Sequence, residues 1–171
     1  WTYWYEDEQK EREETYKDGK FDGQFTTWYE SGQKQSAGSY KDGQQDGLWT
    51  YYDEDGQKRV ETIYKEGKKD GLWRRWDKQG NITKQTTYES GQKQRAGSYK
   101  DGQQDSLWEY WYENEQKERE ETYRDGTLDG QFTTWYESGQ KQRAGSYKDG
   151  QQDGLWTYWY ENGQKEREET Y

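Results

Sequence analysis

The sequence repeats itself every 24 residues, and this period restricts its fold more than any other feature. An Asp-Gly pair marks each repeat at Gly23, Gly47 and Gly71, and Ser106 and Gly130 continue the same interval in the second half. A fixed period of this length is typical of arrays in which each repeat is one supersecondary unit. We therefore expect the chain to fold as consecutive copies of one small unit.

Aromatic residues occupy three fixed positions in the repeats, numbered here from the marking glycine as position 0. Position 2 holds Trp or Phe: Trp1, Phe25, Trp49, Trp73, Trp108, Phe132 and Trp156. Position 5, called the position-5 row below, holds Trp or Tyr: Trp4, Trp28, Tyr52, Trp76, Trp111, Trp135 and Trp159. Position 17 holds Tyr: Tyr16, Tyr40, Tyr64, Tyr88, Tyr123, Tyr147 and Tyr171. With 11 Trp and 18 Tyr but few aliphatic side chains, the apolar content of the chain is mainly aromatic.

The turn residues predict that each repeat is a β-hairpin. Asn162-Gly163 separates two segments rich in Trp, Tyr and Thr, which is a strong hairpin signal. A two-residue turn there pairs three sets of residues: Glu161 with Gln164, Trp156 with Glu169, and Gly154 with Tyr171. Asp and Gly in the following "YKDGQQDG" suit a tight turn with positive φ, which returns the chain to the next hairpin.

These hairpins predict an all-β fold. The expected architecture is an elongated, mostly single-layer antiparallel meander sheet built from tandem 24-residue β-hairpin repeats. Alternation along the strands places Trp156, Tyr158 and Tyr171 on one face and Leu155 and Trp159 on the other. Because both faces carry rings among charges and aliphatic residues are scarce, the sequence offers nothing to fill a second layer.

The repeats form a single array over residues 1–171. The predicted boundaries are approximately 1–22, 23–46, 47–70, 71–105, 106–129, 130–153 and 154–171. The segment 71–105 is irregular, because residues 92–105 reproduce the second half of a repeat without its Trp-bearing strand. The expected total is seven hairpins and one additional strand, or fifteen strands.

Composition argues against several classes of function. The absence of Cys and His removes thiolate catalysis and the commonest general base and metal ligand. With 36 acidic against 26 basic residues, the chain is not expected to bind nucleic acid. No apolar run approaches the roughly 20 residues of a membrane span, so we expect no membrane insertion. No cofactor motif is visible, and the sequence indicates no compartment.

Glutamates recur in the second strand of the repeats, for example at Glu166, Glu168 and Glu169. Paired carboxylates can hydrolyse glycosides, but an active site needs one distinctive constellation, and these residues recur unchanged in several repeats. We therefore expect a solvated charged face, with Glu14 exposed on it, and a protein that is not an enzyme.

The composite pattern "DGLWTYWYENGQKEREETYKDG" resembles the variant MORN repeat of bacteria. The resemblance covers essentially the whole chain, with departures at Glu8 and Glu115 in place of the turn glycine and at Ser106 in place of the marking glycine. Proteins with this repeat include antitoxin components of the YwqK kind, and related arrays are scaffolds or lipid-contacting modules. The resemblance therefore implies a scaffold or an inhibitor of a toxin.

Asp pairs in the return loops allow two interpretations. The pairs are Asp18 and Asp22, Asp42 and Asp46, Asp101 and Asp105, Asp125 and Asp129, and Asp149 and Asp153. In register they could gather Ca²⁺, which takes six to eight oxygen ligands. Asp also caps turns by accepting hydrogen bonds from nearby backbone N–H groups. We favour capping and expect no metal site.

The aromatic rows are the candidate binding and structural residues. Positions 2 and 17 are predicted to be structural, with neighbouring repeats burying their rings. The position-5 row is the candidate binding surface, because exposed Trp and Tyr rings bind apolar patches or stack on sugars. The predicted partner is a protein, or a second copy added at the open sheet edges, and a glycan is the alternative.

Overall fold

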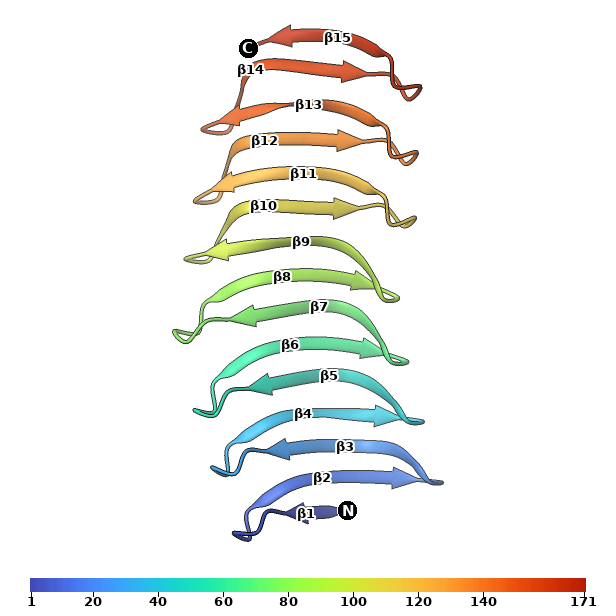
Figure 1. Ribbon diagram of the computed structural model, residues 1–171, viewed down its shortest axis with the longest axis vertical. Coiled ribbons are helices and arrows are strands. Elements are labelled where there is room, and N and C mark those ends of the chain that lie inside the picture. Colours follow the sequence, from blue (N-terminus) through green and yellow to red (C-terminus); the bar gives the residue numbers. More distant parts are fainter. The chain divides into compact units, whose positions relative to one another are not determined.

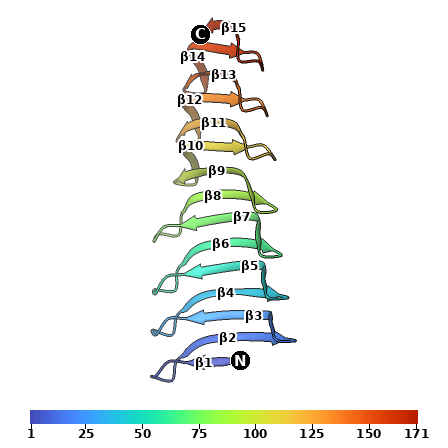
Figure 2. The same ribbon diagram turned by 45° about the vertical axis from the view of Figure 1, so that its right-hand side comes forward.

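A computed structural model describes all 171 residues, Trp1–Tyr171. It confirms the all-β meander: fifteen antiparallel strands follow one another in chain order in one open sheet, with no helix (Figure 1). Figure 2 shows the same strands after a 45° turn, each joined to the next by a short connection. The strands are β1 (Thr2–Trp4), β2 (Lys10–Lys17), β3 (Lys20–Trp28), β4 (Lys34–Lys41), β5 (Gln44–Tyr52), β6 (Lys58–Lys65), β7 (Lys68–Trp76), β8 (Ile82–Glu89), β9 (Gln92–Lys100), β10 (Gln103–Trp111), β11 (Lys117–Arg124), β12 (Thr127–Trp135), β13 (Lys141–Lys148), β14 (Gln151–Trp159) and β15 (Lys165–Thr170).

The chain forms two compact units. The N-terminal unit comprises residues 1–82 and 88–91, and the C-terminal unit comprises residues 83–87 and 92–171. The irregular segment contains β8 and β9, and Ser90-Gly91 lies between these two strands with positive φ at both residues. A short turn therefore replaces the missing Trp-bearing strand.

The turn inside each hairpin differs from the prediction. Gly163 N–H donates to Tyr160 O at 2.9 Å, and Tyr160 N–H donates to Gln164 O at 2.9 Å. Glu161 therefore does not pair with Gln164, and the expected two-residue turn is wrong. The loop has three residues, with Gly163 in the left-handed region at φ 83°, as in a type I turn followed by a bulge.

The outer register of the same hairpin is nevertheless the predicted one. Trp156 pairs with Glu169, and Gly154 and Tyr171 exchange backbone hydrogen bonds of 3.2 and 3.1 Å. A bulge between Tyr158 and Trp159 absorbs the extra turn residue, so the pairing beyond it is unchanged.

The return connection is the two-residue hairpin turn. Lys148 pairs with Gln151 across Asp149 and Gly150, whose φ angles are 50° and 83°. Positive φ at both central residues defines a type I′ turn, which Asp-Gly favours. The prediction that Asp and Gly of the "YKDG" segments form tight return turns is confirmed.

The position-0 residue lies in a bulge where consecutive repeats meet. Ala144 pairs with Thr157 and Ser146 with Asp153, so three residues of β14 face the single residue Gly145. The first of these three, Gly154, has φ 70°. Ser106, at the equivalent place in β10, has φ 62°. This conformation is unfavourable for residues that carry a Cβ.

The core is one layer of rings packed on the neighbouring strand. Trp156 is buried, and its ring lies 5.2 Å from that of Tyr147 and 5.5 Å from that of Phe132. Its indole covers Gly145, where a Cβ would lie 2.3 Å from the ring, and Trp156 Nε1–H donates to Ser146 O at 3.1 Å. The same arrangement joins Trp49 to Gly38 and Trp108 to Gly97.

A second pairing explains why two types of repeat alternate. Where the preceding strand carries Glu in place of this Gly, the ring at position 2 is the smaller Phe: Glu14 pairs with Phe25, and Glu121 with Phe132. Matching a large ring to Gly and a smaller ring to Glu keeps the layer filled without overpacking.

Candidate functional site

The position-5 row lies at the ends of the Trp-bearing strands, directly before the three-residue hairpin turns. Trp4 is exposed, and the other members are half-buried: Trp28, Tyr52, Trp76, Trp111, Trp135 and Trp159. The predicted binding row therefore consists of rings that keep part of their surface accessible to solvent.

A tyrosine that follows this row links consecutive repeats. Tyr112 Oη donates to Trp135 O at 2.8 Å, and Tyr136 Oη donates to Trp159 O at 3.0 Å. In the N-terminal unit, Tyr5 and Tyr29 make the same bonds to the carbonyls of Trp28 and Tyr52. Sequence reasoning missed this contact, although the recurring Trp-Tyr pairs mark it.

Lysines from neighbouring strands cover several of these rings. Lys10 Nζ lies 5.5 Å from the centre of the Trp28 ring, and Lys58 Nζ lies 5.1 Å from that of Trp76. In the C-terminal unit, Lys93 Nζ lies 5.6 Å from the Trp111 ring centre. These distances are within the range of cation–π attraction.

An open pocket of about 560 Å³ lies beside Trp111 in the C-terminal unit. Its lining consists of Gln94, Trp111, Tyr112, Glu113, Asn114, Glu118 and Glu137. Asn114 Nδ2 donates to Glu137 O at 2.9 Å and so ties two consecutive hairpin turns together. Burial first, and then the charges of Glu118 and Glu137, raise the pKa of Tyr112.

A pocket of about 490 Å³ occupies the same repeat position beside Trp76 in the N-terminal unit. Its lining consists of Gln57, Lys58, Trp76, Asp77, Lys78, Gln79 and Gly80. Asp77 caps this turn by accepting backbone hydrogen bonds from Gln79 and Asn81, and these bonds lower its pKa. The two pockets share an indole but differ in charge.

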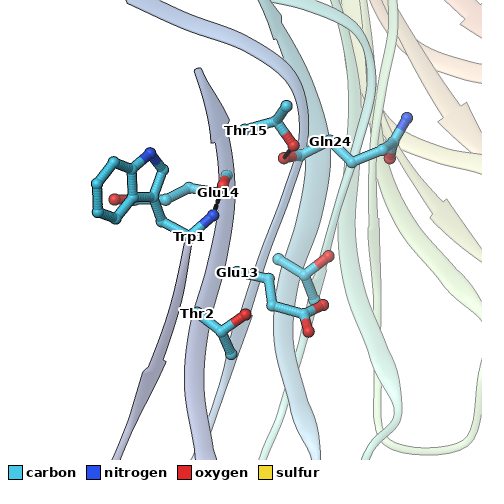
Figure 3. Close-up of a pocket in the computed structure, with 7 residues that line it drawn as sticks. Trp1, Thr2, Glu13, Glu14, Thr15 and Gln24 are labelled. Atoms are coloured by element: carbon cyan, nitrogen blue, oxygen red, sulfur yellow. Dashed lines mark hydrogen bonds between the residues drawn. The ribbon is translucent and has the colours of Figure 1, made fainter.

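A smaller hollow of about 200 Å³ lies at β1–β3 and is lined by Trp1, Thr2, Glu13, Glu14, Thr15, Gln24 and Thr26 (Figure 3). The amino group of Trp1 donates to Glu14 O at 2.7 Å (Figure 3). No ring of the position-5 row contributes to it.

The rows predicted to be structural lie mainly in the ring layer. Trp49, Trp108, Phe132 and Trp156 are buried, and Phe25 and Trp73 are half-buried. Trp1 differs, because no strand of this chain lies outside β1, and its side chain is 77% exposed. At position 17, Tyr16 and Tyr171 are exposed and the other members are half-buried: Tyr40, Tyr64, Tyr88, Tyr123 and Tyr147.

Glu14 corrects an expectation from the sequence. It is 3% exposed rather than solvated, because Phe25 covers its strand on the ring side of the sheet. Its carboxylate accepts a hydrogen bond of 3.0 Å from Tyr16 Oη and lies 3.0 Å from Arg12 Nε. Glu121 is buried in the same way between Arg119 and Tyr123.

Two return-loop carboxylates cap turns. Asp22 Oδ2 accepts a hydrogen bond of 3.3 Å from Asp42 N–H, and Asp70 Oδ1 accepts one of 3.1 Å from Ser90 N–H. Each bond reaches from one return turn to the next. No group of three acidic side chains is arranged to hold a metal ion, and no helix could span a membrane.

Comparison with known families decides the class of this chain. The MORN repeat variant family matches residues 21–42, 45–66, 69–89, 104–125, 128–149 and 152–171. The chain belongs to the MORN repeat variant family. The gap in the MORN matches at 90–103 contains β9, the strand that interrupts the period. No curated protein matched the sequence.

Membership in the MORN repeat variant family gives the coarse class of function. MORN repeats suggest a repeat scaffold, often one that binds proteins or membrane lipids, and the fold is typically non-enzymatic. Half-buried rings, amides and turn backbone surround the two larger pockets of this MORN array, and these groups suit binding.

Proposed function

We propose that this chain is a non-enzymatic scaffold that binds protein partners through the position-5 rings of each unit. The observation that carries the proposal is the recurrence of an open pocket beside a position-5 indole, at Trp76 in one unit and at Trp111 in the other. Half-buried Trp rings provide large, rigid contact surface at small entropic cost, which makes them common anchors of interfaces.

The arrangement of the row supports this proposal. Tyrosine hydrogen bonds hold the backbones of four members of the row against the preceding repeats: Trp28, Tyr52, Trp135 and Trp159. These four rings are therefore presented by a preorganised surface, and binding a partner there costs little ordering of the scaffold.

Selection from a random peptide display library on the whole chain tests this function. We expect at least one family of peptides to be enriched, and its binding to be lost when the indole of its own pocket is removed, in Trp76→Ala for the N-terminal unit or in Trp111→Ala for the C-terminal unit. The matched control is Leu48→Ala, at an exposed aliphatic residue outside both pockets, which should bind like the parent. Circular dichroism of each variant shows whether the fold is retained. Absence of any enriched peptide, or equal loss in the control, contradicts the proposal.

A glycan is the second candidate, and the amides in the pockets favour it. Gln94 and Asn114 lie beside Trp111, and Gln57 and Gln79 lie beside Trp76. An indole face with adjacent amides can stack on a sugar ring and hydrogen-bond its hydroxyl groups. A glycan array probed with the parent and with the same two Trp variants separates this candidate from peptide binding.

The YwqK-like resemblance adds a narrower form of the main proposal, in which the protein partner is a toxin that the scaffold inhibits. Co-expression of the chain with a toxin encoded beside it tests this form. If the parent chain restores growth and the Trp111→Ala variant does not, the result supports this form. If the parent and the variant restore growth equally, the position-5 row is not the inhibitory surface.

A further inference from the structure

The C-terminal unit carries an acidic surface beside its position-5 row. Glu113 and Glu137 occupy the same place in consecutive hairpin turns, and Glu118 lies with them around Trp111. The carboxylates of these three residues form no ion pair, whereas Glu109, Glu120 and Glu121 on the same strands pair with Lys117 or Arg119. The pocket therefore has uncompensated negative charge next to an indole.

We propose that this pocket and the turns beside it bind a basic, extended segment of a partner protein, with Lys or Arg at every third residue. This inference rests on the proposed function and specifies the chemistry of the partner. A cationic side chain at Trp111 would gain both the carboxylates and the ring, since ammonium and guanidinium groups are attracted to indole faces.

The chain itself shows that this ring accepts a cation. Lys93 Nζ lies 5.6 Å from the Trp111 ring centre, at the side of the pocket formed by the neighbouring Gln94. The raised pKa of Tyr112, caused by burial and then by Glu118 and Glu137, reflects the negative charge around the same ring.

The spacing of the turns sets the spacing of the basic residues. Consecutive hairpin turns are two strands apart, or roughly 9.6 Å at about 4.8 Å per strand. A polyproline II helix has three residues per turn and rises about 3.1 Å per residue, so every third side chain points the same way, roughly 9.3 Å apart. In a β-strand, side chains three apart lie on opposite faces. Aromatic-lined grooves are a common receptor for polyproline II segments.

The N-terminal unit provides an internal contrast. At the equivalent pocket, Lys58 lies over Trp76 as Lys93 lies over Trp111, but Lys78 stands where the C-terminal repeats have Glu113 and Glu137. Positive charge at this place opposes a basic segment, so we expect no binding at the pocket beside Trp76.

The test uses the whole chain and two synthetic peptides of equal charge. One is a fluorescent tetramer of Pro-Pro-Lys, and the other has the same composition with its lysines grouped at one end. Fluorescence anisotropy at physiological salt should show binding of the spaced peptide that is about tenfold tighter than that of the grouped peptide. The double variant Glu113→Lys/Glu137→Lys should weaken binding of the spaced peptide by about tenfold or more. Glu30→Lys/Glu54→Lys makes the same charge change at the same repeat positions of the N-terminal unit. This control variant should bind the spaced peptide as the parent does.

Each contrary result overturns the proposal. Equal affinity for the two peptides indicates general attraction to an acidic protein, and equal weakening by both double variants places the site elsewhere. Absence of binding also rejects it. The display selection keeps this failure distinct from failure of the proposed function, because an enriched motif without basic residues supports a protein-binding scaffold and rejects only the basic partner.

Discussion

Trp156 lies directly across Gly145 of the neighbouring strand, and a Cβ at Gly145 would approach its indole to 2.3 Å. This contact makes the first prediction. Gly145→Ala should lower the free energy of unfolding by about 1–3 kcal/mol, because the buried ring cannot move away without disturbing the layer. Urea denaturation measures the loss.

A compensating change provides the control for this contact. Phe stands at position 2 where the facing residue is Glu, as in the pairs Glu14–Phe25 and Glu121–Phe132, whereas Trp73 faces the smaller Thr62. The double variant Gly145→Ala/Trp156→Phe should therefore be more stable than the sum of the two single changes predicts, by at least about 0.5 kcal/mol. Additive effects would show that the two side chains do not compete for the same space.

Much of this fold follows from the sequence, because turn chemistry and period are local properties. The Asp149-Gly150 turn and the pairing of Trp156 with Glu169 follow from residue types and spacing alone. The three-residue loop at Gly163 does not, because Asn-Gly suits two turn types, and the bulge at Trp159 that accommodates the longer loop leaves the outer register unchanged.

The candidate site was less predictable than the fold. Repeat position marks Trp111, but its carboxylate neighbours Glu118 and Glu137 come from the following strand and the next turn, and only the three-dimensional register brings them together. Burial of Glu14 could not be read from charge, because it depends on Arg12 and Tyr16 being on the same face.

Removal of the hydroxyl of Tyr112 should weaken the junction between two repeats. Tyr112→Phe deletes the 2.8 Å hydrogen bond to Trp135 O and should cost about 1 kcal/mol of stability. Tyr160 occupies the same repeat position, is exposed and makes no such bond, so Tyr160→Phe should be nearly neutral. Thermal denaturation of both variants checks the prediction, and equal losses would argue against the hydrogen bond as the cause.

Glu14 and Glu13 are adjacent in β2 but should respond differently to truncation. Glu14→Ala leaves Tyr16 Oη without its partner and removes the carboxylate beside Arg12, so we expect a loss of about 1.5–3 kcal/mol. Glu13 makes only an exposed ion pair with Lys10, and its truncation should stay within about 0.5 kcal/mol. Similar melts for the two variants would contradict the burial of Glu14.

Alkaline pH should destabilise the array through its tyrosines. Burial raises the pKa of Tyr123, and its hydrogen bond to the Glu121 carboxylate raises it further. A raised folded pKa favours the neutral phenol, so this stabilisation is complete below the unfolded value near 10 and declines as the pH rises above it. Tyrosinate absorbance and urea melts from pH 8 upward should show this decline, and Tyr123→Phe should make it shallower. A stability that stays flat to pH 11 would contradict the mechanism.

Glu8, Ser106 and Glu115 have positive φ at places where other repeats carry Gly, and replacing Ser106 or Glu115 by Gly should stabilise the protein. Ser106 has φ 62° in the bulge of β10, and Glu115 has φ 65° in the following hairpin turn, where other repeats carry Gly. A residue with a Cβ costs about 1–2 kcal/mol in this region, so Ser106→Gly and Glu115→Gly should each raise the free energy of unfolding by about 0.5–1 kcal/mol after the added flexibility of the unfolded chain is subtracted. Ala96→Gly, in the extended strand β9, is the control and should destabilise, because Gly in a strand interior loses packing and gains unfolded-state freedom. If the two positive-φ variants were destabilised like the control, side-chain contacts rather than backbone strain would govern these positions.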